Sequence, residues 1–171
     1  MPKGFFYLIL LLSFTVSLGE AAGFNEPDLK TPGALLFTPP EGWEAAGPEE
    51  LPFTIHWMVV GKGLSSYPPS INLGIEPYQG TLKEYLKLVK AINLAQGTPW
   101  RDLGTMRTQA GSGSLSQADI ETEWGTVRLM HLIFLRSGRI YIVTAAALKE
   151  EFARFYSLFF QAMKSVRFNP D

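Results

Sequence analysis

The sequence contains no cysteine among its 171 residues. Disulfide bonds are therefore excluded, and so is a bacterial lipid anchor, which requires a cysteine at the processing site. N-glycosylation is disfavoured too, because none of Asn25, Asn72, Asn93 and Asn169 begins an Asn-x-Ser/Thr motif. A stable fold has to come from a packed core, and together these absences favour a bacterial protein.

An excess of charge of one sign is also lacking. The chain carries 15 Lys and Arg against 16 Asp and Glu, a formal net charge of −1. No basic stripe runs along the sequence of the kind that binds nucleic acid. We therefore expect no nucleic-acid partner, and polyanionic partners in general are disfavoured.

The N-terminus is typical of a secretory signal peptide. Lys3 precedes an apolar run over 5–18, and small residues follow at 19–23. The run is shorter than the roughly 20 residues that a membrane-spanning helix needs, and the small residues place a cut before Glu20 or before Ala22. We expect a signal peptide over 1–21, a lead-in loop over 22–33 and one domain over 34–171, exported to the periplasm or cell exterior. An uncleaved segment that anchors the protein remains an alternative, and it is the only membrane contact expected.

The rest of the chain changes its hydrophobic period several times. Alternating or continuous apolar residues predict strands over 34–38, 53–60, 71–76, 102–109, 115–124, 127–135 and 140–145. Helical spacing predicts a helix over 81–93, where Thr81 and Glu84 form a capping box, and a second helix over 148–163. A Gly/Ser run over 110–114 predicts a flexible turn, and 136–139 a hairpin loop. This order predicts an α+β fold: a mainly antiparallel sheet with helices packed on it.

One motif points to a family. The run Phe37-Thr-Pro-Pro-Glu-Gly-Trp43 resembles the F-x-x-P-x-G-W opening of PsbP-like domains. Further similar segments are Ser70–Leu73, Gly80–Leu82, Gly138–Thr144, Phe152–Tyr156 and Met163–Ser165. The resemblance covers 34–168 and implies a PsbP-like α/β/α sandwich around a twisted antiparallel sheet. The family includes exported bacterial members of unknown function. Its members share no common reaction, so the resemblance implies no activity and no functional residue for this chain.

Two histidines are candidate metal ligands. If the strands carrying His56 and His131 are neighbours, Glu121 or Glu123 can complete a zinc site. The alternative is two ordinary residues of a partly polar sheet face, because the sequence has no His pair spaced two or four apart.

The other candidates are weaker. They are the loop Gly61–Ser66 as a phosphate site, Ser112, Ser114 and Ser116 as nucleophiles, Asp119, Glu121 and Glu123 as an acid/base face, and Trp43, Trp57, Trp100 and Trp124 as a stacking surface. None has the spacing or context of a known motif. We therefore predict no catalytic, cofactor-binding or metal-binding residue, and no cofactor.

Three functions remain open. The first is a non-enzymatic exported domain that binds an unknown protein partner or supports an envelope assembly, through an apolar patch on the sheet or near the loop 61–69. The second is a periplasmic module that binds a small ligand between sheet and helix. The third is a hydrolase with an unrecognised site, tested by replacing Glu121, Glu123 and His131 together.

Overall fold

A computed structural model of the chain describes residues 33–52, 54–65 and 67–170. The predicted signal peptide and all but the last residue of the lead-in lie outside these ranges. Within them the elements, in chain order, are β1 (Leu35–Leu36), β2 (Glu44–Ala45), a 3-10 helix η1 (Pro48–Glu50), β3 (Ile55–Val60), β4 (Ser70–Pro77), α1 (Leu82–Ala95), β5 (Trp100–Thr108), β6 (Gly111–Thr122), β7 (Gly125–Arg136), β8 (Arg139–Leu148), α2 (Phe152–Lys164) and β9 (Arg167–Phe168).

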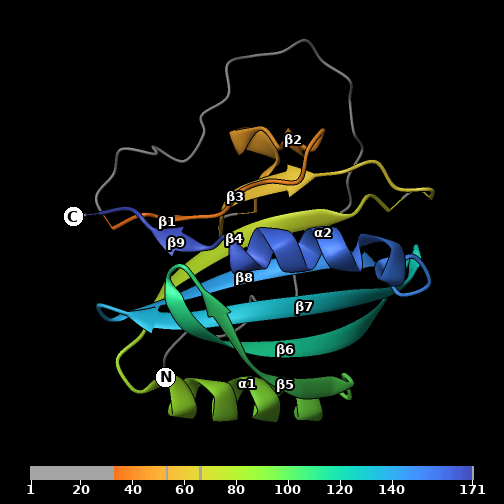
Figure 1. The fold of residues 1–171 in the computed structure, drawn as a ribbon. Coiled ribbons are helices and arrows are strands. Elements are labelled where there is room, and N and C mark those ends of the chain that lie inside the picture. Colours follow the sequence, from red (N-terminus) through yellow and green to blue (C-terminus); the bar gives the residue numbers. More distant parts are fainter. Residues whose placement is uncertain (1–32, 53, 66, 171) are drawn as a thin grey trace.

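Seven of these strands form one sheet in the order β2-β3-β4-β8-β7-β6-β5, with every neighbouring pair antiparallel. β1 and β9 pair separately, so the two ends of the described chain lie side by side. Helix α2 covers one face of the sheet and helix α1 the other (Figure 1). The predicted α+β fold with a mainly antiparallel sheet is confirmed.

The main core lies between α2 and the sheet. Phe152, Phe159 and Met163 of α2 are fully or almost fully buried against inward-facing side chains of the central strands. β7 and β8 are buried on both faces: Leu132 and Val143 face α2, while Ile133 and Ile142 face α1. This explains why the sequences of these two strands are apolar almost throughout.

Helix α1 begins as its sequence predicts. The Thr81 hydroxyl accepts a hydrogen bond from the Glu84 backbone N–H at 3.3 Å, and the Glu84 carboxylate accepts one from the Thr81 N–H at 2.8 Å. The Glu84 carboxylate also accepts a hydrogen bond from the Thr81 hydroxyl at 2.8 Å, and the two hydrogen bonds that it accepts from Thr81 hold the pKa of the Glu84 carboxyl below its usual value. Tyr85 and Val89 then point into the sheet. Neither helix in the described ranges is long and apolar enough to cross a membrane.

The motif that carries the family resemblance is a structural device. Gly42 has φ +75°, and the Trp43 N–H donates to the Pro40 carbonyl at 3.2 Å, which makes a turn that favours glycine at this position. The turn delivers the Trp43 ring to α2, where it packs edge-on against Phe159. Phe37 stacks on Trp57 with ring centroids 4.2 Å apart.

The predicted flexible turn over 110–114 is wrong, because 111–114 belong to β6. Gly113 and Ser114 are buried, and a Cβ at Gly113 would come within 2.8 Å of the side chains of Leu132 and Phe134. The glycine thus permits close packing inside the sheet, not a loop. Leu148 likewise ends β8 and does not begin α2.

Candidate functional site

The sheet keeps the two histidines apart. His56 is exposed at a bulge in β3, whereas His131 is buried on β7, and both β4 and β8 lie between them. Three strand spacings of about 4.8 Å put their backbones roughly 14 Å apart or more. The condition for a zinc site shared by both histidines is therefore not met, and nowhere in the described ranges do three or more His, Cys, Asp or Glu side chains gather in a way that could hold a metal ion.

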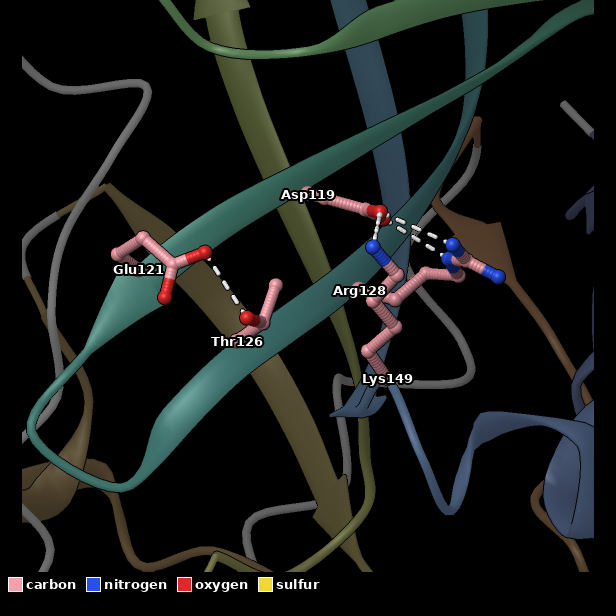
Figure 2. A network of polar contacts seen from close by, with 5 residues as sticks. All are labelled: Asp119, Glu121, Thr126, Arg128 and Lys149. Atoms are coloured by element: carbon pink, nitrogen blue, oxygen red, sulfur yellow. Dashed lines mark hydrogen bonds and ion pairs between the residues drawn. The ribbon is translucent and has the colours of Figure 1, made fainter.

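The acidic strand face is engaged in polar contacts, as Figure 2 shows. The Asp119 carboxylate accepts hydrogen bonds from Arg128 Nε at 2.8 Å and Arg128 Nη2 at 2.9 Å, and it lies 3.1 Å from Lys149 Nζ. The guanidinium of Arg128, and secondarily Lys149, hold the pKa of Asp119 below its usual value. Asp119 is thereby kept ionised and tied to two cations, which suits a structural clamp and not a proton-transferring acid.

The other members of the acidic set do not join a catalytic group. Glu121 accepts a hydrogen bond from the Thr126 hydroxyl at 2.8 Å, and Glu123 lies exposed in the turn after β6. Side chains alternate between faces along a strand, so Glu121 lies on the α2 face of the sheet and His131 on the α1 face. Glu121, Glu123 and His131 therefore do not form one site.

His131 belongs to a polar row that the sequence did not predict. Ser116, His131, Thr144 and Asn72 are successive cross-strand partners on β6, β7, β8 and β4. His131 is 7% exposed, and its Nδ1 lies 3.0 Å from Thr144 Oγ1. Burial lowers the pKa of His131 to about 4, so the ring is neutral at neutral pH.

Ser116 does not act as a nucleophile paired with this histidine. The serine is 1% exposed, and its Oγ has no hydrogen-bond partner among the described residues. The orienting partner of His131 is the hydroxyl of Thr144, whereas a nucleophile–base pair needs a hydrogen bond from the hydroxyl to the base. The four polar residues thus form a row across the α1 face of the sheet, which is otherwise mainly apolar.

The four tryptophans are distributed over separate clusters, so they form no common stacking surface. Trp43 and Trp57 belong to the α2 side of the sheet, Trp100 packs with the α1 cluster, and Trp124 packs with Tyr67. The loop predicted over Gly61–Ser66, of which Ser66 lies outside the described residues, does not have the context of a phosphate loop, because the next element is β4 and not a helix. Its Gly61 has a packing role: a Cβ there would lie 2.4 Å from the Trp43 ring.

That same loop takes part in a surface with an exposed apolar side chain, which makes it a candidate binding surface. The described residues of the β3–β4 loop (61–65 and 67–69), the β6–β7 turn (123–124) and the β8–α2 link (149–151) all lie at one end of the sheet, on the right in Figure 1. We call this surface the loop end. Leu64 projects from it with 69% of its surface exposed.

Contacts join the three segments, and one of them involves the backbone of Leu64. The Leu64 N–H donates to the carboxylate of Glu151 at 3.4 Å, and Glu151 is itself only 7% exposed. Tyr67 packs on Trp124 with ring centroids 5.7 Å apart, and the Lys149 N–H donates to the Thr126 carbonyl at 2.9 Å. The exposed leucine therefore lies on a loop whose described residues contact the two neighbouring segments. The sequence offers a signal for the exposed leucine, because Leu64 is the single apolar residue in the run Gly-Lys-Gly-Leu-Ser-Ser. It offers no signal for the hydrogen bond between Glu151 and the Leu64 backbone.

Two solved structures are similar to this one. LpqN, involved in cell envelope biogenesis of Mycobacterium tuberculosis, matches with a TM-score of 0.58 at 15% identity, covering 82% of this chain and 87% of LpqN. Cyanobacterial PsbP (CyanoP) from Synechocystis matches with a TM-score of 0.50 at 11% identity, covering 88% of this chain and 98% of CyanoP. No family model and no curated protein matches the sequence.

The sheet and the two helices that cover its faces form an α/β/α sandwich, and the loop end lies at one end of its antiparallel sheet. Its closer classification follows from the two solved structures: the chain has the PsbP-like fold that the Phe37–Trp43 motif predicts. At these identities the likeness shows the fold, and fold alone does not define a reaction.

Proposed function

We propose that this domain is exported and acts in the cell envelope by binding another protein through the loop end, without catalysing a reaction. The observation that carries the proposal is the exposed Leu64 side chain on a loop held by Glu151. An apolar anchor surrounded by polar residues is the usual arrangement of a protein-binding hot spot. The surroundings fit: Lys62, Glu123, Lys149 and Glu150 are all exposed at this end.

Two further points support the proposal. Three residues with catalytic potential are placed unfavourably for catalysis: Asp119 is bound by two cations, and Ser116 and His131 are buried. The structurally similar LpqN is a protein of cell envelope biogenesis. Export rests on the N-terminal sequence, and a mass measurement of the mature protein tests it: the expected N-terminus is Glu20 or Ala22, and an intact Met1 would contradict cleavage.

The binding surface is tested by a photo-crosslinking amino acid placed at position 64 in producing cells. Position 94 is the matched control, because Leu94 is 78% exposed but lies at the end of α1. We expect one discrete crosslinked protein from position 64 and none from position 94. Purified Leu64→Asp should compete for that partner about 30-fold less well than Leu94→Asp, the loss typical of a strong interface anchor. Equal crosslinking from both positions, or equal competition, would refute the proposal.

A further inference from the structure

Basic side chains gather at the end of the sheet opposite the loop end. The β5–β6 turn, the β7–β8 hairpin, the end of α2 and β9 meet there, on the left in Figure 1. Two contacts join them: the Ala110 N–H donates to the Val166 carbonyl at 2.8 Å, and the Arg136 guanidinium lies 4.2 Å from the centre of the Phe168 ring. We call the surface the basic end and define it by its cations, Arg107, Arg136, Arg139, Lys164 and Arg167.

The acidic residues of the described chain lie mostly elsewhere. Four are in or near β2 and η1, and five are at or beside the loop end: Glu41, Glu44, Glu49, Glu50, Asp119, Glu121, Glu123, Glu150 and Glu151. Closest to the basic end are Glu76, which is hydrogen-bonded to Tyr85, and Glu84, which caps α1. Within the described ranges no ion pair involves Arg107, Arg139, Lys164 or Arg167. Among the described residues, the five cations of the basic end therefore outnumber the acidic side chains close to them.

Aromatic rings support two of the cations. Arg136 lies over Phe168, and Lys164 Nζ lies 5.4 Å from the centre of the Phe160 ring. Phe160 and Phe168 are both half-buried. Long basic side chains whose stems lie on apolar rings, with the charged heads at the surface, suit the boundary between lipid headgroups and water.

The N-terminal part of the chain leads to the same end. The N–H of Gly33, the first described residue, donates to the Asn169 carbonyl at 3.2 Å, two residues beyond Arg167. The apolar run ends at Leu18, 15 residues before Gly33. The N-terminal side of the described domain, where the export segment is attached before cleavage, therefore lies at the basic end.

We propose that the basic end binds the anionic headgroups of a lipid membrane. The five cations come from four separate parts of the chain. Such a scattered arrangement suits the diffuse negative potential of a membrane surface. It suits an extended acidic peptide less well, because the charges of such a peptide are regularly spaced along one line. This contact is independent of the protein-binding role proposed for the loop end, because the two surfaces lie at opposite ends of the sheet.

The test measures binding of the exported protein, as purified from producing cells, to two kinds of vesicle. One is phosphatidylcholine alone and the other an equimolar mixture with phosphatidylglycerol. Any residual apolar segment binds both kinds, so the ratio of the two partition coefficients isolates the electrostatic part. One basic residue near an anionic surface strengthens binding about fivefold, so Arg139→Gln with Arg167→Gln should reduce the ratio about 30-fold.

The matched control replaces Lys62 and Lys90 with Gln, which changes the net charge equally but lies away from the basic end. It should leave the ratio within about twofold of wild type, and added salt should lower the wild-type ratio. Equal binding of wild type to both vesicles, or equal loss in both double variants, would overturn the proposal. Binding to polyglutamate without binding to anionic vesicles would also overturn it, in favour of an acidic protein partner. If the Arg167→Gln change impairs folding, Arg139→Gln alone, in the exposed hairpin, should still lower the ratio about fivefold.

Discussion

The buried imidazole of His131 makes the stability of this domain depend on pH. The ring is 7% exposed and its Nδ1 lies against the Thr144 hydroxyl. Burial lowers the pKa in the folded chain to about 4, from the usual value of 6.5. Between these two pH values the unfolded chain binds a proton that the folded chain does not. The contribution of the neutral His131 ring to the free energy of unfolding is therefore fully present above about pH 6.5. It falls as the pH drops toward 4, and below that pH this residue causes no further loss.

The size of the effect follows from the two pKa values. The difference of 2.5 corresponds to about 3 kcal/mol over the whole interval, at roughly 1.4 kcal/mol per pKa unit. From pH 7 to pH 4.5 the loss is about 2 kcal/mol, because the interval is not complete. With a urea m-value of about 2 kcal/mol/M, the unfolding midpoint should fall by about 1 M.

The assay compares urea unfolding at pH 7 and pH 4.5 for wild type, His131→Gln and the control His56→Gln. Carboxylates titrate in all three proteins, so the difference between them isolates the histidine. We expect His131→Gln to lose about 2 kcal/mol less than wild type between the two pH values. His56→Gln should follow wild type, because His56 is exposed and its replacement leaves the buried imidazole of His131 in place. Parallel losses in wild type and His131→Gln, or an NMR titration of His131 near pH 6.5, would refute the reasoning.

Three further substitutions test the packing and the polar contacts. Asp119→Ala should destabilise the fold by about 1–3 kcal/mol at pH 7, because it leaves two cations without their carboxylate. The control Glu121→Ala should destabilise it by less than about 1 kcal/mol. Chemical denaturation measures both changes. Gly61→Ala should lower stability by about 1–3 kcal/mol, since the new methyl meets an indole ring at 2.4 Å. Gly74→Ala, whose methyl meets its first neighbour only at 3.5 Å, should not, and equal thermal shifts in the two variants would contradict this account. Thr81→Ala should cost about 1 kcal/mol by removing the cap of α1, and an unchanged unfolding midpoint would show that the cap contributes nothing.

The elements that sequence reasoning predicted well are those whose periodicity is undisturbed. Helix α1 has both a clear apolar stripe and its own capping box, and the α2 pattern differs from its prediction mainly at Leu148. β4 and the pair β7–β8 were also recognisable, the pair from apolar residues on both faces and the two-residue turn at Ser137 and Gly138. In each case the signal is local, so neighbouring residues contain the information.

The misses share a physical cause, which is that the decisive partner is distant in sequence. Gly113 reads as part of a flexible Gly/Ser run, and only the side chains of β7 lying over it show that it is a packed strand position. β9 has two residues and pairs with β1 across more than 130 positions of sequence. The polar row around His131 exists only because the sheet register aligns four strands.

The two proposed surfaces constrain each other, and this gives a last prediction. β7 runs from the loop end to the basic end and has 12 residues, so the ends are roughly 40 Å apart at 3.3 Å per residue. If the basic end rests on lipid headgroups, Leu64 faces away from the membrane and remains available to a protein partner. The absence of cysteine makes the geometry measurable, because one introduced thiol takes one environment-sensitive fluorophore. A label at Gln109→Cys, exposed in the β5–β6 turn, should change its emission on anionic vesicles, and one at Ser65→Cys, exposed beside Leu64, should not. An emission change at position 65 equal to that at position 109 would show that the domain does not stand on the membrane by its basic end.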